Sequence, residues 1–491
     1  MKKAEVARTA VLVCAFCVAM VVAASAQKFA AESFDSSNGG NPSPGAMVQG
    51  FNGNLYGTTY AGGANSNCAN GVFSGCGTVF QLSPSGKLSA LYSFCSLANC
   101  ADGIRPASGV ILGADGNLYG TTDLGGANNG LTYLGGTVFR LTSTGKLRTL
   151  YSFCSQLNSY DICLDGAAPN GLVQARDGNL YGTTAQGGNG DVGNQICNNP
   201  DGGQLGCGTI FKIDASGKLT TLYDFCLQLN RGGYCPDGAA PQRVLVQARD
   251  RNLYGTTPSG GANPCSFSLE CGTIFRISRS GTFSRIYSFC PDGGSCADGN
   301  TPSVLIAGVD GNLYGIASQA GPLGGGSIFQ LSPTGKLTTI YGFCNSLQSA
   351  CPDGSFPLSL LQATDGNLYG TTGGGGTGCI YNSVNGCGTI FRLTTKGVIT
   401  TLHSFCQNLC DDGYDPYSLA QGTNGILYGT TEAGGADQGC TTGGCGAVYG
   451  LSAGLKPLVE SSPDFGRPGQ TTATLGNNLG IRPRIVPHCH E

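Results

Sequence analysis

One phrase, usually D-G-N-L-Y-G-T-T, returns along most of this chain and constrains its fold more than any other feature. Each of the first six copies leads on to G-[TS]-[VI]-F and, after a turn, to an apolar run ending in L-Y-S-F or a close variant. The last copy has I-L-Y-G and G-A-V-Y instead. Self-similarity at 55–73 residues indicates a fold of seven similar units. The repeated tyrosines are Tyr56, Tyr119, Tyr181, Tyr254, Tyr314, Tyr369 and Tyr428.

Each unit contains four segments of strand-like composition. Asp115-Gly116 predicts a type I′ hairpin turn between the first two segments of the second copy, and Ser143-Thr144-Gly145 predicts a tight turn between the last two. Four antiparallel strands repeated seven times favour an all-β, seven-bladed β-propeller of four-stranded antiparallel blades over a sandwich. The four segments of that copy are Gly109–Ala114, Asn117–Thr122, Gly136–Thr142 and Lys146–Phe153.

The two ends of the repeat region predict how the ring closes. The last copy offers three strands and no clear L-Y-S-F strand. The N-terminal segment Phe29–Phe34 is therefore expected to be the outer strand of the last blade, which removes exposed sheet edges; Leu455–Glu460 is the alternative. The predicted domains are a propeller over residues 27–454 and a short, truncated extension over residues 455–491. The three strands expected in the last copy are Ser418–Thr423, Ile426–Thr431 and Gly446–Leu451.

Residues 1–26 have the features of a secretory signal peptide. Lys2, Lys3 and Arg8 precede an apolar stretch, and Ala24-Ser25-Ala26 is a small-residue cleavage site. An uncleaved membrane anchor is the alternative interpretation. After the first 30 residues no apolar span of 18 residues occurs, so no membrane span is expected once the signal is removed. The expected location is secreted: extracellular or at the cell surface.

Charge and histidine content narrow the classes of function. The chain has 26 Lys+Arg against 29 Asp+Glu, a net charge of −3, which argues against nucleic acid as a partner. The mature chain has only three histidines, His403, His488 and His490. This scarcity argues against a histidine triad or a histidine metal centre. We expect His403, which replaces the tyrosine of one L-Y-S-F strand, to have a core or surface role.

The cysteines predict local disulfide bonds. Of 25 cysteines, two lie in the signal, Cys489 is left over, and the other 22 fall into close pairs. Export permits disulfides, and spacings of 4–10 residues do not match zinc-ligand pairs, so zinc is the weaker alternative. Five pairs precede G-[TA]-[VI]-[FY]: Cys68/Cys76, Cys197/Cys207, Cys265/Cys271, Cys379/Cys387 and Cys440/Cys445. Six follow the L-Y-S-F strand: Cys95/Cys100, Cys154/Cys163, Cys226/Cys235, Cys290/Cys296, Cys344/Cys351 and Cys406/Cys410.

A four-stranded meander sorts these features onto two faces. The short D-G and S-G-K turns share one face, which we call the turn face. Every predicted disulfide and nearly all variation in loop length fall on the opposite face, which we call the loop face. Variable loops on a rigid scaffold are where binding usually resides. The loop face is therefore the predicted binding surface.

An aspartate recurs in the loops that join the blades, as D-G-x-x-P or a one-residue variant. Two functional interpretations are calcium ligation and paired carboxylates for glycoside chemistry. The alternative, favoured because the motif appears in nearly every blade, is a structural Asx turn before the proline. No cofactor is expected, with calcium left open. The candidate binding residues are Asp102, Asp165, Asp237, Asp298, Asp353 and Asp412.

A glutamine recurs in the first strand of five blades. If that strand is innermost, the side chains either line an axial channel or satisfy neighbouring backbone groups, and we favour the second interpretation. These residues are Gln49, Gln174, Gln247, Gln362 and Gln421.

The combined phrase D-G-N-L-Y-G-T-T…G-T-[VI]-F-[RK]-[LI]…G-K-L-x-x-L-Y-S-F resembles the GloVer tandem repeat of secreted bacterial proteins with a choice of C-terminal anchors. The resemblance covers about residues 29–453 and implies an exported, often surface-attached bacterial protein; it supplies no activity and no catalytic residues. Leu458–Leu479 is similar to the opening of an IPT/TIG immunoglobulin-like domain. Only about 30 of the roughly 80–90 residues of such a domain are present, which predicts a truncated domain.

Together these observations favour a disulfide-stapled recognition or cell-surface module without catalytic activity, whose partner is a glycan or a protein. One alternative is a polysaccharide hydrolase or lyase that uses loop carboxylates; a structural envelope protein is another. Whether carboxylates converge near the ring axis is the observation that best separates these alternatives.

Overall fold

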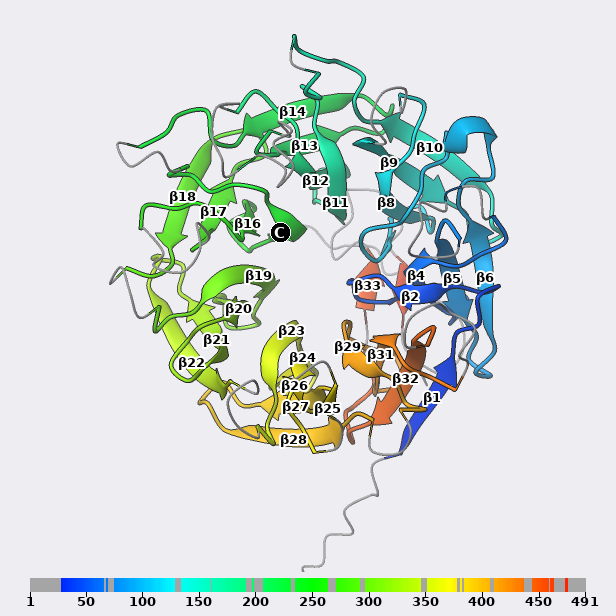
Figure 1. Cartoon of the computed structure of the whole chain (residues 1–491), viewed down its shortest axis with the longest axis vertical. Helices are drawn as coiled ribbons and strands as arrows, with labels where there is room; N and C mark the ends of the chain where they lie inside the picture. Colours follow the sequence, from blue (N-terminus) through cyan, green and yellow to red (C-terminus); the bar gives the residue numbers. More distant parts are fainter. Residues whose placement is uncertain are drawn as a thin grey trace, which may run out of the picture.

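The structure, a computed structural model, is an all-β propeller whose seven antiparallel blades form a ring, as predicted (Figure 1). The named elements include one short 3₁₀ turn, η1 (Ala98–Cys100). No helix among the described residues is long and apolar enough to cross a membrane. The structure describes residues 28–458, 460–462 and 473–475, except 66–67, 69–74, 129–133, 160, 191–196, 198–205, 231–234, 264–270, 292–295, 346–350, 378–379, 382–383, 407–409 and 437–443. The predicted signal peptide lies outside these residues.

In blades 1 to 6 the first strand is innermost and the strands follow outward in chain order. Blade 1 has β2 (Gly40–Pro42), β3 (Val48–Gln49), β4 (Leu55–Ala61), β5 (Thr78–Leu82) and β6 (Leu88–Ser93). Blade 2 has β7 (Ile111–Leu112), β8 (Leu118–Leu124), β9 (Leu134–Leu141) and β10 (Leu147–Ser152). Blade 3 has β11 (Ala167–Gln174), β12 (Leu180–Gln186), β13 (Thr209–Ile213) and β14 (Leu219–Asp224).

The next three blades repeat this arrangement. Blade 4 has β15 (Gln242–Gln247), β16 (Leu253–Thr257), β17 (Thr273–Ile277) and β18 (Phe283–Ser288). Blade 5 has β19 (Asn300–Ala307), β20 (Leu313–Gln319), β21 (Gly324–Leu331) and β22 (Leu337–Cys344). Blade 6 has β23 (Ser355–Gln362), β24 (Leu368–Gly374), β27 (Thr389–Leu393) and β28 (Ile399–Ser404), with a small hairpin of β25 (Ile380–Tyr381) and β26 (Val384–Asn385) between its second and third strands.

Blade 7 joins the two ends of the ring. Its inner strands are β29 (Tyr414–Pro416), β30 (Ala420–Gln421), β31 (Ile426–Ala433) and β32 (Ala447–Ser452), and its outermost strand is β1 (Phe29–Ser33). The register runs from Phe29 opposite Leu451 to Ser33 opposite Ala447. Closure by the N-terminal strand is thus confirmed, and the alternative closure by Leu455–Glu460 is wrong. In the extension, β33 (Glu460–Ser462) pairs with β34 (Ala473–Leu475).

The repeated motifs form the core between blades. Tyr181 and Phe225 of blade 3 are fully buried and share one cluster with Phe275 of blade 4. Packing of this kind continues around the ring in further clusters that each draw on neighbouring blades. The second threonine of L-Y-G-T-T is buried and hydrogen-bonds a threonine of the third strand, as in Thr59–Thr78 at 2.9 Å. Burial of apolar surface in every seam therefore holds the ring together.

The turns between the first two strands differ from the prediction. A type I′ turn needs positive φ at both Asp115 and Gly116, yet only Gly116 has it, at +77°. The Gly113 N–H donates to the Asn117 carbonyl at 2.8 Å, which closes a longer loop of three residues. Asp115 accepts the Asn117 N–H at 3.1 Å and so stabilises an Asx turn instead.

The innermost strands are not equivalent around the ring. They are continuous over eight residues in blades 3, 5 and 6. In blades 1 and 7 they are split into β2/β3 and β29/β30, and in blade 2 only β7 remains of the predicted Gly109–Ala114 strand. Three neighbouring blades, 7, 1 and 2, therefore present irregular backbone at the inside of the ring.

Candidate functional site at the inner rim and channel

Disulfide bonds form on the loop face as the cysteine spacing predicts. Cys271, Cys387 and Cys445 are also disulfide-bonded, but their predicted partners Cys265, Cys379 and Cys440 lie outside the described residues, as does Cys489. Cys197, Cys207, Cys226 and Cys235 have all four sulfur atoms within 4.8 Å of one another because two disulfides lie side by side. The eight pairs described in full are Cys68–Cys76, Cys95–Cys100, Cys154–Cys163, Cys197–Cys207, Cys226–Cys235, Cys290–Cys296, Cys344–Cys351 and Cys406–Cys410.

The loop aspartates bind the outer strand of their own blades. The fully buried Asp102 accepts hydrogen bonds from the Tyr92 hydroxyl at 2.8 Å, the Ser96 N–H at 2.9 Å and the Leu97 N–H at 3.2 Å. The glycine that follows packs on the buried threonine of the second strand, where a Cβ on Gly103 would lie 2.2 Å from the Thr122 hydroxyl. The D-G pair therefore fastens the loop to the outer strand of one blade and to the second strand of the next.

An equivalent contact recurs in the other five loops, with histidine in place of tyrosine in one, so the structure does not bring the six carboxylates together. Asp165, Asp237, Asp298 and Asp353 each accept a hydrogen bond from the tyrosine of L-Y-S-F. Asp412 pairs instead with His403 Nε2 at 2.8 Å, and His403 stacks on Phe29 with ring centroids 3.9 Å apart. A ligand-binding role for these aspartates stays a prediction, and their contacts favour the structural interpretation.

The recurrent glutamines satisfy backbone groups, as the favoured interpretation states. Gln49 Oε1 accepts the Thr423 N–H at 2.8 Å and so joins blade 1 to blade 7, while its Nε2 donates to the Gly53 carbonyl at 3.0 Å. Leu112 and Ala307 replace the glutamine in blades 2 and 5. Each of the other four accepts a backbone N–H from the preceding blade: Gln174 from Ala114, Gln247 from Arg176, Gln362 from Val309 and Gln421 from Thr364.

One set of positions differs from blade to blade. It is a ring of residue pairs, one pair at the loop-face ends of the two innermost strands of each blade, and we call this ring the inner rim. Each pair consists of the residue before the loop proline and its cross-strand neighbour after T-T, as in Asp415 and Glu432. The residue before the proline has positive φ, 49–57°, in all seven blades. Blades 3 to 6 place small or uncharged residues there: Ala168/Ala185, Ala240/Pro258, Thr301/Ser318 and Phe356/Gly373. Blades 7, 1 and 2 place Asp415/Glu432, Asn41/Tyr60 and Arg105/Asp123.

Two carboxyl groups meet in the blade 7 part of the inner rim. Burial, with a contribution from the negative charge of Glu432, raises the pKa of Asp415 to about 7. Burial also raises the pKa of Glu432, although a hydrogen bond with Tyr417 opposes that shift. The Asn41 side chain reaches the Glu432 carbonyl from blade 1 at 3.4 Å. Asp415 can therefore exchange a proton near neutral pH, and the pair can bond to a ligand as donor or acceptor.

A second charged group lies between blades 1 and 2. The Arg105 guanidinium donates to the Tyr60 hydroxyl at 3.3 Å and lies 5.1 Å from the centre of its ring. Burial raises the pKa of Asp123, and the positive charge of Arg105 opposes that shift. Arg105, Tyr60 and Asp123 thus extend the polar part of the inner rim around the same three blades whose inner strands are interrupted.

An arginine crosses the inside of the ring to these blades. Arg243 belongs to β15 of blade 4, and its Nη1 donates to the Pro44 carbonyl of blade 1 at 3.5 Å. Burial lowers the pKa of Arg243, and the interaction with Tyr417 of blade 7 opposes that effect. Blade 4 lies across the ring from blades 1 and 7 (Figure 1). The guanidinium therefore occupies the channel between them.

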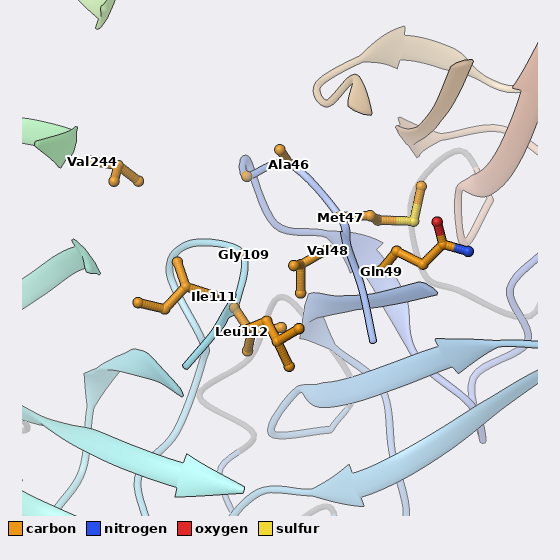
Figure 2. A pocket seen from close by; sticks show the side chains of 10 residues that line it. Ala46, Met47, Val48, Gln49, Gly109, Ile111, Leu112 and Val244 are labelled. Carbon is orange, nitrogen blue, oxygen red and sulfur yellow. The ribbon is translucent and has the colours of Figure 1, made fainter. Parts of the chain in front are cut away.

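Below the inner rim the channel contains an apolar pocket of about 390 Å³, large enough for a small organic ligand. Figure 2 shows Met47, Val48, Ile111 and Leu112 on one side and Val244 on the other. The interrupted strands of blades 1 and 2 make this space, and Leu112 stands where five other blades have glutamine. The Pro44 carbonyl that accepts from Arg243 directly precedes Gly45, which lines the pocket, so the guanidinium lies beside the pocket wall.

The motifs that the repeats share do not predict the inner rim. The sequence does carry a different signal for it. In a chain with only 11% charged residues, Arg105, Asp123, Asp415 and Glu432 occur at repeat positions where most copies have small or uncharged residues. A functional site that is present only once in a ring of repeats is expected where the sequence departs from the repeat. Arg243 gave no comparable signal, because its approach to blades 1 and 7 depends on the ring geometry.

The chain belongs to the Gloeobacter/Verrucomicrobia repeat family, whose model matches residues 20–225 and 194–381. These matches cover most of the chain and agree with the tandem repeats. A comparison with curated proteins found no significant match.

A solved structure supports the fold. A streptogramin B lyase structure is 16% identical, with a TM-score of 0.50, over 87% of this chain and 97% of that chain. A catalytically inactive virginiamycin B lyase from Staphylococcus aureus, solved with quinupristin, is 15% identical with a TM-score of 0.49, over 87% and 99% of the two chains. At this level of identity the likeness concerns the propeller alone.

Proposed function

We propose that this protein is an extracellular recognition module that binds a glycan at the inner rim without catalysing a reaction. The observation that carries the proposal is the restriction of charged rim residues to blades 7 and 2, on either side of the polar Asn41/Tyr60 pair of blade 1, whereas the other four blades have small or uncharged residues at those positions. A scaffold role alone does not require such asymmetry. Binding of one ligand does, because one ligand meets only part of a sevenfold ring.

The chemistry of the rim suits hydroxyl-rich ligands. Asp415, Glu432 and Asp123 offer carboxyl groups, Tyr60 and Tyr417 offer rings with hydroxyls, and Arg105 offers a fork of donors. Such groups can replace their present hydrogen bonds with hydrogen bonds to sugar hydroxyls. The rim lies at the ends of the innermost strands around the ring axis, and the chain end of a glycan fits such an opening better than a flat protein surface does.

Disulfides and the family relationship support an exported location. Buried disulfides such as Cys226–Cys235 form and persist in oxidising compartments. We extend the proposal to a secreted protein at the cell surface, with its signal peptide at residues 1–26 removed. The IPT/TIG-like segment that begins at Leu458 is proposed to belong to a surface-attachment region.

The proposal can be tested by probing an array of bacterial and plant glycans with fluorescently labelled protein. We expect binding to a defined subset of glycans and at least a tenfold loss of affinity in an Asp415→Asn/Glu432→Gln variant, because several hydrogen bonds weaken together. Glu32→Gln on exposed β1 removes a carboxylate far from the rim and is the matched control. An unchanged profile in the rim variant contradicts the proposal, as does the absence of any bound glycan.

A polysaccharide hydrolase or lyase is the second candidate, and one observation favours it. The raised pKa of Asp415, about 7, beside a second carboxyl group is the environment in which a general acid or base works at neutral pH. Release of reducing ends from the bound glycans, lost in Asp415→Asn but kept in Glu32→Gln, would support this function. Binding without release at any pH between 5 and 8 would exclude it for those glycans.

A further inference from the structure

Arg243 is a cation that lacks a carboxylate partner within the part of the chain that the structure describes. No carboxylate oxygen there lies within ion-pair distance of its guanidinium. Its hydrogen bond to a protein group is the 3.5 Å contact with the Pro44 carbonyl. A guanidinium carries five donors in a planar fork that matches a carboxylate. Most of its capacity to bind an anion is therefore unused.

The guanidinium lies beside an apolar surface, which favours a hydrocarbon group rather than a charged one. The pocket beside it has a volume of about 390 Å³ and is lined by aliphatic side chains, among them Met47, Ile111, Leu112 and Val244. Val244 is 40% exposed, although it is a large apolar residue inside the ring. Isolated exposed apolar residues are common, but one that faces a pocket with an apolar opposite wall is typical of a ligand site.

We propose that the channel contains a second ligand site, below the inner rim, for a small organic anion with an apolar body. Its carboxylate pairs with the Arg243 guanidinium through charge-assisted hydrogen bonds, and its hydrocarbon part occupies the pocket between blades 1, 2 and 4. Desolvation at the site strengthens the ion pair, because the ligand body displaces water from the pocket. A ligand with only one of the two features gains only one of the two interactions.

This inference is independent of the proposed glycan function, because it uses Arg243 and the aliphatic pocket rather than the carboxyl groups of the rim. A protein that binds no glycan can still bind an apolar anion. The reverse also holds, so the two experiments can fail separately.

Four probes separate the contribution of the anionic group from that of the hydrocarbon. Their binding to the oxidised protein is measured by isothermal titration calorimetry. Octanoate carries both the anion and the hydrocarbon, octanol carries only the hydrocarbon, acetate carries only the anion, and octylamine carries the opposite charge. We expect octanoate to bind at least tenfold more tightly than the other three, in a 1:1 complex. Equal binding of octanoate and octanol, or no binding of octanoate, overturns the proposal.

Three variants locate the site. Arg243→Gln is expected to weaken octanoate binding about tenfold and to leave octanol binding unchanged, because it removes the charge and keeps the chain length. Ala46→Phe, on the exposed Ala46 of the pocket wall, is expected to block octanoate by filling the pocket while Arg243 stays intact. Arg148→Gln, on the exposed surface of β10, is the matched control and should bind octanoate as the wild type does.

The two site variants keep the test decisive if one of them folds poorly, since each acts on a different part of the site. Melting temperature and circular dichroism establish folding before titration. Octanoate binding that survives both Arg243→Gln and Ala46→Phe, or that is lost equally in Arg148→Gln, contradicts the assignment.

Discussion

The carboxyl pair of blade 7 is the residue-scale feature with the clearest consequence for stability. Because the pKa of Asp415 is about 7 when folded and near 3.8 when unfolded, the folded state binds more protons between these values. The contribution of Asp415 is then fully present below about pH 4 and is lost as pH rises through about 7. The raised pKa of Glu432 acts in the same direction.

We therefore predict that Asp415→Asn flattens the decline of stability from pH 4 to pH 8. At pH 8 the variant should be more stable than the wild type by about 1–3 kcal/mol, because a buried charge has been removed. Urea unfolding at several pH values measures this difference, with Glu32→Gln as the control. Parallel pH profiles for wild type and Asp415→Asn would show that Asp415 does not titrate with a raised pKa.

The loop aspartates predict a different outcome, because they accept hydrogen bonds that hold the loops in place. Asp102→Asn places an amide group where the Tyr92 hydroxyl and two backbone N–H groups need acceptors. We expect a loss of about 1–3 kcal/mol in unfolding free energy. Asp411→Asn in an equivalent loop changes an exposed aspartate and should cost almost nothing. Equal effects of the two substitutions in denaturant unfolding would refute the structural role of Asp102.

At the scale of elements, each glutamine of the inner strands links its blade to the preceding one, and Gln49 does so where the ring closes. Gln49→Leu reproduces the residue that blade 2 already has at Leu112. We predict a loss of about 1 kcal/mol, since one inter-blade hydrogen bond disappears and the Thr423 N–H loses its partner. Thermal unfolding measures the effect, and Gln242→Leu, at an exposed glutamine of β15, is the control. No difference between the two variants would show that this bond does not stabilise the closure.

The elements also show how far sequence reasoning reaches. Strand order, blade number and disulfide pairing follow from local periodicity, which each repeat carries within itself. The length of the inner strands does not, because Gly109–Ala114 has strand-like composition but pairs only over Ile111–Leu112. The turn type at Asp115-Gly116 was wrong because the Asx bond to Asn117 favours a longer loop. The inner rim leaves no motif in one repeat, because its charged pairs are departures from the repeat that show only when the copies are compared.

At the scale of the whole molecule, the ring is closed by one short strand from the other end of the chain. Phe34, directly after β1, is fully buried against Phe80 of blade 1, with ring centroids 4.9 Å apart. We predict that removal of residues 27–34 exposes the edge of β32, lowers the melting temperature by more than 10 °C and causes self-association. Light scattering after size-exclusion chromatography detects the association. A monomer with unchanged melting temperature would contradict closure by β1.

The central claim is that only one part of a near-uniform ring, the inner rim of blades 7, 1 and 2, binds the ligand. Hydrogen–deuterium exchange tests this claim most directly. The measurement compares the free protein with its complex with the tightest-binding oligosaccharide from the array. The account predicts slower exchange in residues 41–47, 105–110 and 414–419, which border the inner rim in blades 1, 2 and 7. Protection confined to the turn face, or distributed equally over all seven blades, would contradict it.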